Sequence, residues 1–219
     1  MIFRYFTALA ALAALATGVA LGAAALSPKP HGAEIAFVAS IQKDLNARFP
    51  TIADAEKAGY FRYTNEDDTG AISYVNLRWT SNDPQHPSQL WYGVNGKLLG
   101  ADFSQPYSAG NPPKLWGVAP SRWIQFGAHV HYVLNQSGMM AYGHSTSVKK
   151  FEAAGGNIND PQAATLVKMG LAKNVNAVKA VFLFPNIWDL EVWVMPNPNG
   201  AFADKNPLVH PSANAQSMD

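Results

Sequence analysis

The sequence predicts an α+β fold: a largely antiparallel β-sheet or partial barrel with N-terminal helices and a two-helix insertion before the last strands. Two observations lead to this prediction. Apolar residues recur at helical spacing early in the chain and again after residue 147. Between and after these segments lie short β-branched and aromatic runs separated by Gly, Asn and Pro. An order of helices, strands, helices and strands is typical of α+β proteins.

Four segments carry helix signals. They are residues 33–48, 52–58, 148–154 and 161–169. The first has apolar side chains at Val38, Ile41 and Leu45, which fall on one side of a helix. The second follows Thr51, a residue type that caps helix N-termini. The fourth begins at Pro161, which the first turn of a helix tolerates.

The predicted strands are shorter and rich in aromatic and β-branched residues. They cover residues 71–79, 89–94, 97–103, 123–134, 139–144, 177–184 and 188–195. Asn95-Gly96 lies between two of these runs, and this dipeptide favours a tight β-hairpin turn. No internal repeat or long linker divides the chain, so we expect one domain.

Composition narrows the class of function. The chain has 219 residues with a formal net charge of +1, and no basic stripe indicates nucleic-acid binding. It has no cysteine, which excludes disulfides and thiol catalysis. Any metal ion must therefore be held by His, Asp, Glu or Met. The expected partner is a small molecule or a metal ion.

The first residues have the pattern of an export signal. Arg4 precedes an apolar, Ala-rich run, and small residues follow it. We expect a signal peptide at 1–25, a single domain at 26–208 and a flexible tail at 209–219, in a protein that is periplasmic or secreted. An uncleaved leader is the alternative, and it would be the chain's link to a membrane.

A histidine pair supplies the candidate site. In the predicted strand 123–134, His129 and His131 share the polar face, because side chains two apart point the same way. If residues 135–138 form the turn of a hairpin, His144 lies directly opposite His129. Three imidazoles would then meet on one face. A slip of one residue in the register would move His144 to the other face.

The last predicted strand offers a carboxylate. Glu191 lies among large apolar residues, an unfavourable place for a lone charge if that face is covered. Facing His129, His131 and His144, it would complete a His₂–Glu or His₃–Glu site for a divalent transition metal: Zn, Cu, Fe or Mn. The protein would then be a metal-binding protein and, in one interpretation, a metal-dependent enzyme.

Other interpretations stay open. The polar face of these strands is also what the solvated side of a one-layer sheet looks like. A metal-free polar pocket, a non-catalytic binding protein and a structural envelope protein are further alternatives. The acidic run at 66–68 fits an acidic turn better than a Ca²⁺ site, because the alternating ligand spacing is missing.

Several motifs resemble a broad group of uncharacterised exported bacterial proteins. They are Thr51–Tyr60, His129–His131, Leu190–Val194, Asn199–Phe202 and Asn206-Pro207. In that group the position of Glu191 is often a histidine. The resemblance implies a metal ligand at this position and no known activity.

Overall fold

The structure is a computed structural model that describes residues 27–78, 83–107 and 110–216. The predicted leader at 1–25 and the end of the predicted strand at Trp79 lie outside the described residues. Within them the fold is α+β with antiparallel sheets, as the sequence predicts. The described part contains no helix long and apolar enough to cross a membrane.

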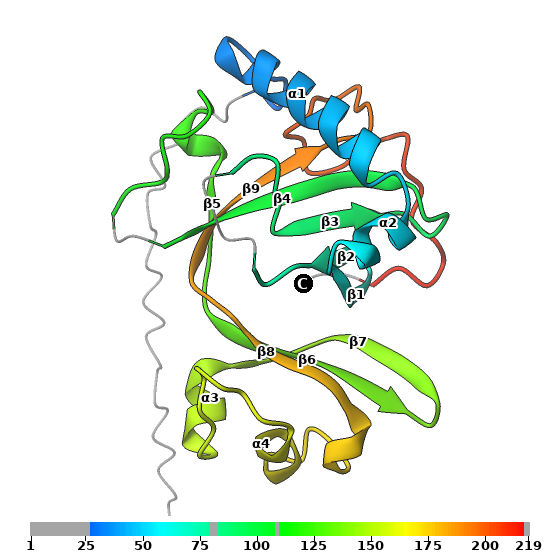
Figure 1. Cartoon of the computed structure of the whole chain (residues 1–219), viewed down its shortest axis with the longest axis vertical. Coiled ribbons are helices and arrows are strands. Elements are labelled where there is room, and N and C mark those ends of the chain that lie inside the picture. Colours follow the sequence, from blue (N-terminus) through cyan, green and yellow to red (C-terminus); the bar gives the residue numbers. More distant parts are fainter. Residues whose placement is uncertain (1–26, 79–82, 108–109, 217–219) are drawn as a thin grey trace, which may run out of the picture.

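Two antiparallel sheets face each other in the molecule (Figure 1). The six-stranded sheet has the order β1-β2-β3-β4-β9-β5, and the three-stranded sheet has the order β7-β6-β8. The strands of the large sheet are β1 (Phe61–Glu66), β2 (Ile72–Val75), β3 (Gln89–Tyr92), β4 (Leu98–Pro106), β5 (Ile124–Phe126) and β9 (Ile187–Trp193). Those of the small sheet are β6 (His129–Gln136), β7 (Met139–Ser147) and β8 (Val178–Phe184).

Helices cover the outer face of each sheet. The helices are α1 (Ala33–Arg48), α2 (Ile52–Lys57), α3 (Val148–Ala153) and α4 (Ala163–Lys168), with 3₁₀ turns at Pro120–Arg122 and Val175–Ala177. Figure 1 shows α1 across the large sheet and α3 and α4 on the far side of the small sheet. The inner faces of the two sheets are therefore turned toward each other.

The core under α1 follows the predicted helical spacing. Val38, Ile41 and Leu45 are buried against Leu190 and Val192 of β9. Burial of these apolar side chains holds the helix on the sheet. Ile35, one turn before Val38, is 58% exposed and lies outside this core.

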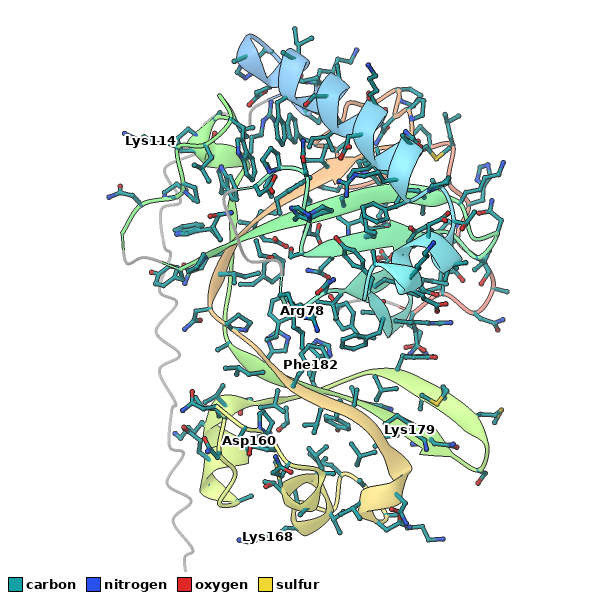
Figure 2. The ribbon with its side chains drawn as sticks, in the orientation of Figure 1. Arg78, Lys114, Asp160, Lys168, Lys179 and Phe182 are labelled. Carbon is teal, nitrogen blue, oxygen red and sulfur yellow. The ribbon has the colours of Figure 1, made fainter. Side chains whose placement is uncertain are left out.

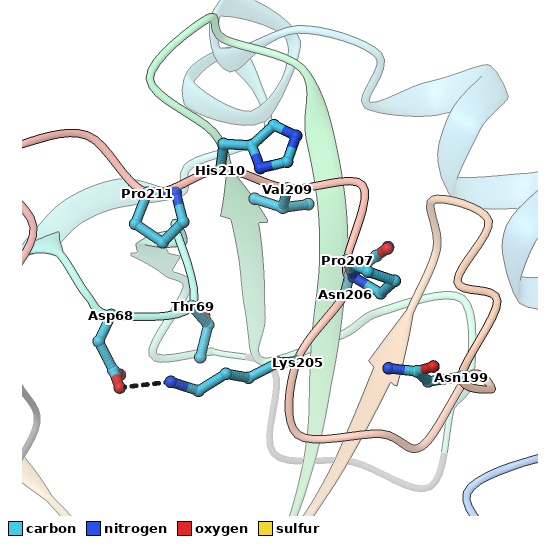
Figure 3. A pocket seen from close by; sticks show the side chains of 9 residues that line it. All are labelled: Asp68, Thr69, Asn199, Lys205, Asn206, Pro207, Val209, His210 and Pro211. Atoms are coloured by element: carbon cyan, nitrogen blue, oxygen red, sulfur yellow. Dashed lines mark hydrogen bonds and ion pairs between the residues drawn. The ribbon is translucent and has the colours of Figure 1, made fainter.

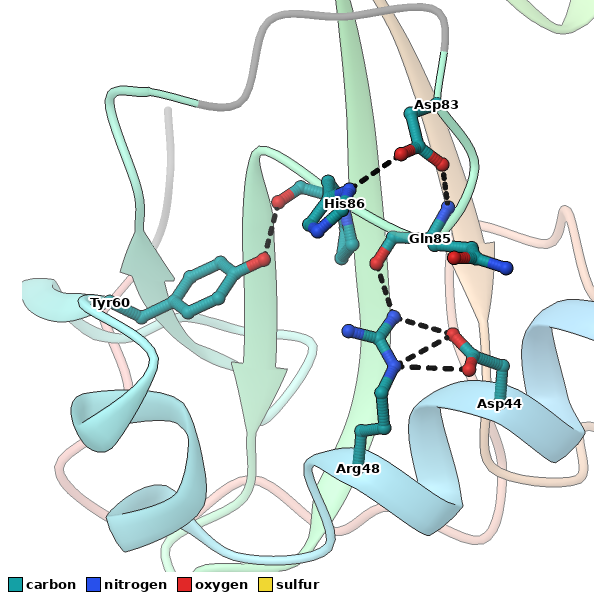
Figure 4. Close-up of polar contacts among 7 residues, drawn as sticks. Asp44, Arg48, Tyr60, Asp83, Gln85 and His86 are labelled. Carbon is teal, nitrogen blue, oxygen red and sulfur yellow. Dashed lines mark hydrogen bonds and ion pairs between the residues drawn. The ribbon is translucent and has the colours of Figure 1, made fainter.

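Ion pairs and hydrogen bonds hold both ends of α1 in place. At its start, Glu34 is buried and receives hydrogen bonds from Arg122 at 3.0 and 3.2 Å. At its end, Arg48 binds Asp44 and the carbonyl oxygen of Gln85 (Figure 4). The Tyr60 hydroxyl donates to the carbonyl oxygen of Pro87 at 2.6 Å. These contacts hold the loop that leads into β3.

The prediction of one continuous strand over residues 123–134 is wrong. It breaks at Gly127-Ala128 into β5 and β6, which belong to different sheets. The Ala128 amide donates to the side chain of Asn186 at 2.8 Å, and this bond steadies the crossing. Ile124, in the short strand β5, is 46% exposed. Strand β1 was not predicted.

The segment expected to be a loose tail packs against the large sheet over the residues that are described, 209–216. Ser212 donates two hydrogen bonds to the Glu66 carboxylate, and the amide of Gln216 donates to the Glu66 carbonyl at 2.8 Å. Figure 3 shows the shallow surface hollow beside this segment, where Lys205 and Asp68 form an ion pair at 2.8 Å. The described part of the segment is thus held against β1 through Glu66.

Candidate functional site

A cavity of about 810 Å³ lies between the inner faces of the two sheets. The large sheet contributes polar side chains from β3, β4 and β9, and the small sheet contributes His129 and His131 from β6. The labelled Phe182 lies between the two sheets in Figure 2, where it packs edge-on against Phe61 of β1. Apolar contacts thus hold the sheets together beside the cavity.

Three carboxylates gather on the large-sheet side of this cavity. Asp102 of β4 pairs directly with Glu191 of β9, and Asp189 lies two residues before Glu191 on the same face. One ligand atom from each lies within 4.8 Å of the others. We call Asp102, Asp189 and Glu191 the carboxylate cluster.

Side chains of neighbouring strands position Asp102 and Asp189. The indole nitrogen of Trp91 donates to Asp102 at 3.0 Å. Gly100 makes this possible, because a Cβ there would collide with the Trp91 ring. The Ser104 hydroxyl donates to Asp189 at 2.8 Å and shares a 2.6 Å hydrogen bond with Ser88. Two carboxylates are therefore held rigidly by side chains from β3 and β4.

Burial raises the pKa of every member of the carboxylate cluster. Burial, with the nearby charges of Asp189 and Glu191, raises the pKa of Asp102 well above its usual value. Burial raises the pKa of Asp189 to about 7, although the Ser104 hydrogen bond opposes the shift. Burial raises the pKa of Glu191 as well, and the charge of Asp204 adds to this effect. Without a cation the cluster therefore retains protons near neutral pH.

One oxygen in the cluster has no partner. Asp102 is only 5% exposed, and its Oδ1 makes no hydrogen bond within the described part of the chain. A buried carboxylate oxygen without a partner is unfavourable, because it has lost its contacts with water. Since Asp102 lines the cavity, a ligand there could satisfy this oxygen.

The opposite side of the cavity carries aromatic rings. His129 stacks on Phe184 at a centroid distance of 4.9 Å, and His131 stacks on Phe182 at 5.7 Å. We call these four residues the imidazole wall. Burial lowers the pKa of His131 to about 4, so its ring is neutral at neutral pH. Its Nδ1 has no hydrogen-bond partner among the described residues.

The predicted position of His144 is wrong. The hairpin closes with Gln136 opposite Met139, so the turn has two residues, Ser137 and Gly138, instead of four. Both have positive φ, as such a tight turn requires. A bulge between Tyr132 and Leu134 shifts the register again.

The change in register sends His144 away from the cavity. It pairs with Tyr132, stacks on that ring at 5.3 Å, and therefore lies on the opposite face from His129 and His131. His129 faces Ser147 instead.

The predicted ligand set is thus only partly brought together. His129, His131 and Glu191 all line the cavity, whereas His144 does not. Among the described residues, the single group of three or more ligand-type side chains within 4.8 Å of one another is the carboxylate cluster, which contains no histidine. Asp189 could have been found from the sequence, because it lies two residues before Glu191 on the same predicted strand, whereas Asp102 was missed. An acid inside the apolar run 97–103 was the available signal.

No protein-family model, curated protein or solved structure matched the chain.

Proposed function

We propose that the protein is an exported protein that binds one divalent cation through Asp102, Asp189 and Glu191. The observation that carries the proposal is the unpartnered, buried oxygen of Asp102 within a group of three carboxylates that line a cavity. A cation there would give this oxygen a partner and offset the mutual repulsion of the three groups. The signal-type leader at 1–25 supports export.

The spacing of the ligand atoms suits a hard cation. Oxygens on opposite sides of a Ca²⁺ ion are about 4.6–5.2 Å apart, twice the usual Ca–O distance. The ligand atoms of the carboxylate cluster lie within 4.8 Å of one another. An all-oxygen ligand set favours Ca²⁺, Mg²⁺ or Mn²⁺ over Zn²⁺ and Cu²⁺. The proposal therefore keeps Glu191 as a ligand and replaces the histidines with Asp102 and Asp189.

Binding to the wild-type protein tests the proposal. Chelator-treated mature protein is titrated calorimetrically with Ca²⁺, Mg²⁺, Mn²⁺ and Zn²⁺. We expect one binding site. Zn²⁺ usually binds a given protein site more tightly than Mn²⁺ does, and at this all-oxygen site its affinity should fall furthest below that usual order. Glu191→Gln should abolish binding, because it removes a ligand that makes no other described hydrogen bond. The matched control is Glu152→Gln, an exposed position in α3.

Two results would refute the cation site. One is the absence of binding by any of the four ions. The other is equal binding by wild type and Glu191→Gln.

A second function is favoured by one observation, the pKa of Asp189 at about 7. A carboxyl group that titrates near neutral pH beside other carboxylates can act as a general acid or base. In that case the protein would be a metal-free enzyme that uses the carboxylates of the cavity, which lie within 4.8 Å of one another, for proton transfer. Turnover that persists in excess chelator would favour this alternative over the cation site.

A further inference from the structure

We infer that the part of the cavity not needed by the cation binds a neutral, polyhydroxylated ring, of the kind that a sugar provides. The inference rests on the proposed cation site for its charge balance. A volume of about 810 Å³ far exceeds the space of one ion and falls within the range of small-molecule sites. An organic ligand is therefore expected beside the ion.

Three residues of the imidazole wall, His129, His131 and Phe184, line the cavity on the side opposite the carboxylates. The ring planes of His129 and Phe184 are 19° apart, and those of His131 and Phe182 are 15° apart. Each histidine ring is thus backed by a phenyl ring and has little freedom to turn. Fixed rings of this kind pack well against the C–H face of a sugar ring.

Indole rings border the cavity on the large-sheet side. Trp91 and Trp193 line it and lie edge to face with centroids 5.7 Å apart. The cavity therefore has aromatic side chains from both sheets, with the carboxylates on the large-sheet side beside the indole rings. A ring with one apolar face and polar edges matches this arrangement.

Charge selects against anionic ligands. Six carboxylates among the described residues line the cavity: Glu66, Asp67, Asp102, Asp189, Glu191 and Asp204. Arg122 is the one Lys or Arg among its described lining residues, and it is committed to Glu34 at 3.0 Å. A divalent cation offsets only two of these negative charges, so the cavity keeps a negative charge that disfavours an anionic ligand. The choice of a neutral ligand over a second cation rests on the uncharged polar groups that line the cavity.

Uncharged polar groups line the same cavity. They are the amides of Asn65, Gln89 and Gln216 and the hydroxyls of Ser73 and Ser121. His131 adds an Nδ1 without a partner among the described residues. Such groups both donate and accept hydrogen bonds, as hydroxyl groups require. Neighbouring hydroxyls of a sugar could also ligate a hard cation, which takes six or more oxygens.

Calorimetry with defined probes tests the inference. Protein saturated with its cation is titrated with glucose, N-acetylglucosamine and their disaccharides, each to about 10 mM, where a millimolar complex is detectable. Spermidine and glucuronate serve as cationic and anionic probes. We expect saturable binding of a neutral sugar. His129→Ala should weaken it about tenfold, the loss of one good contact. His210→Ala, an exposed histidine away from the cavity, should leave it unchanged.

The outcomes separate the two proposals, because cation binding is measured independently. Sugar binding that weakens in His129→Ala while cation affinity stays the same supports the inference. A protein that binds the cation but no neutral sugar, or that binds only spermidine or glucuronate, overturns it and leaves the cation site standing. Thermal unfolding of His129→Ala close to wild type verifies that lost binding is not lost folding.

Discussion

The two faces of β9 have opposite chemistry. On the outer face, Leu190 and Val192 are fully buried beneath α1 in a continuous apolar core. On the inner face, Asp189 is buried almost as deeply, and Glu191 is mostly covered. One face follows the rule that buried groups are apolar, and the other places carboxylates where burial raises their pKa.

This contrast separates stability from function within a single strand. Successive side chains of a strand point to opposite faces of the sheet. Alternate residues of β9 therefore pack against the helix layer, and the residues between them line the cavity. The inner face lowers the stability of the ion-free protein, since its carboxylates must either retain protons or be buried with charge. Substitutions on the two faces should therefore change stability in opposite directions.

The largest expected loss comes from the outer face. Leu190→Ala removes a fully buried side chain from the core beneath α1. Its free energy of unfolding should fall by about 2–5 kcal/mol, through lost apolar burial and the space left behind. Urea unfolding measures the change. A loss below 1 kcal/mol (about a tenth of typical stability) would mean that this face is not the stabilising one.

The next effect concerns pH on the inner face. Asp189 has an ordinary pKa of 3.8 and a folded pKa of about 7. Between these values the folded state holds a proton that the unfolded state has released, so this group's contribution to stability falls as pH rises. The free energy of unfolding of ion-free Asp189→Asn, relative to that of ion-free wild type, should therefore rise between pH 4 and pH 7, by up to about 4 kcal/mol.

Comparing the variant with wild type isolates this effect from that of His131. The pKa of His131 is lowered from 6.5 to about 4, so its contribution is lost as pH falls through that range, which is the opposite trend. The histidine contribution is present in both proteins and cancels in their difference. A difference that does not vary with pH would contradict the buried-carboxylate interpretation.

A further gain is expected at Asp102. Asp102→Asn keeps an acceptor for Trp91 and offers an N–H to the neighbouring carboxylates. Because burial raises the pKa of Asp102 well above its usual value, the neutral amide should stabilise the ion-free protein at neutral pH. Asp160→Asn, on an exposed loop, is the control and should change stability by less than about 0.5 kcal/mol.

The smallest expected change in stability comes from Ser104, whose hydroxyl supports the carboxylate cluster. Ser104→Ala removes the hydroxyl that donates to Asp189, and stability should fall by about 1 kcal/mol. The hydrogen bond lowers the pKa of Asp189, so its loss should raise that pKa further and weaken cation binding at neutral pH. Unchanged affinity would show that Ser104 does not position the ligand.

Local patterns predicted much of the fold. Helix α1, the capped helix α2 and the hairpin at Asn95-Gly96 follow from spacing and turn chemistry. The outer face of β9 follows from its alternation. Each of these features depends on neighbours in sequence, which is the information that a single sequence carries best.

The site was harder to predict because it depends on pairing between distant strands. The partnership of Asp102 with Glu191 joins residues 89 positions apart, through the β4–β9 register. His144 was misplaced because the bulge between Tyr132 and Leu134 shifts the register by one residue and moves it to the other face. The break at Gly127 likewise sent β5 and β6 to different sheets. Small local changes of this kind determine which groups meet.

Thermal unfolding of wild type and Asp189→Asn, each with chelator and with saturating Ca²⁺ or Mn²⁺, tests the cation site most directly. A ligand that binds only the folded state raises its stability. With chelator the variant should unfold at a higher temperature than wild type at neutral pH. The cation should raise the unfolding temperature of wild type and leave that of the variant unchanged. Equal shifts in both proteins, or no shift in wild type, would contradict a cation site at Asp102, Asp189 and Glu191.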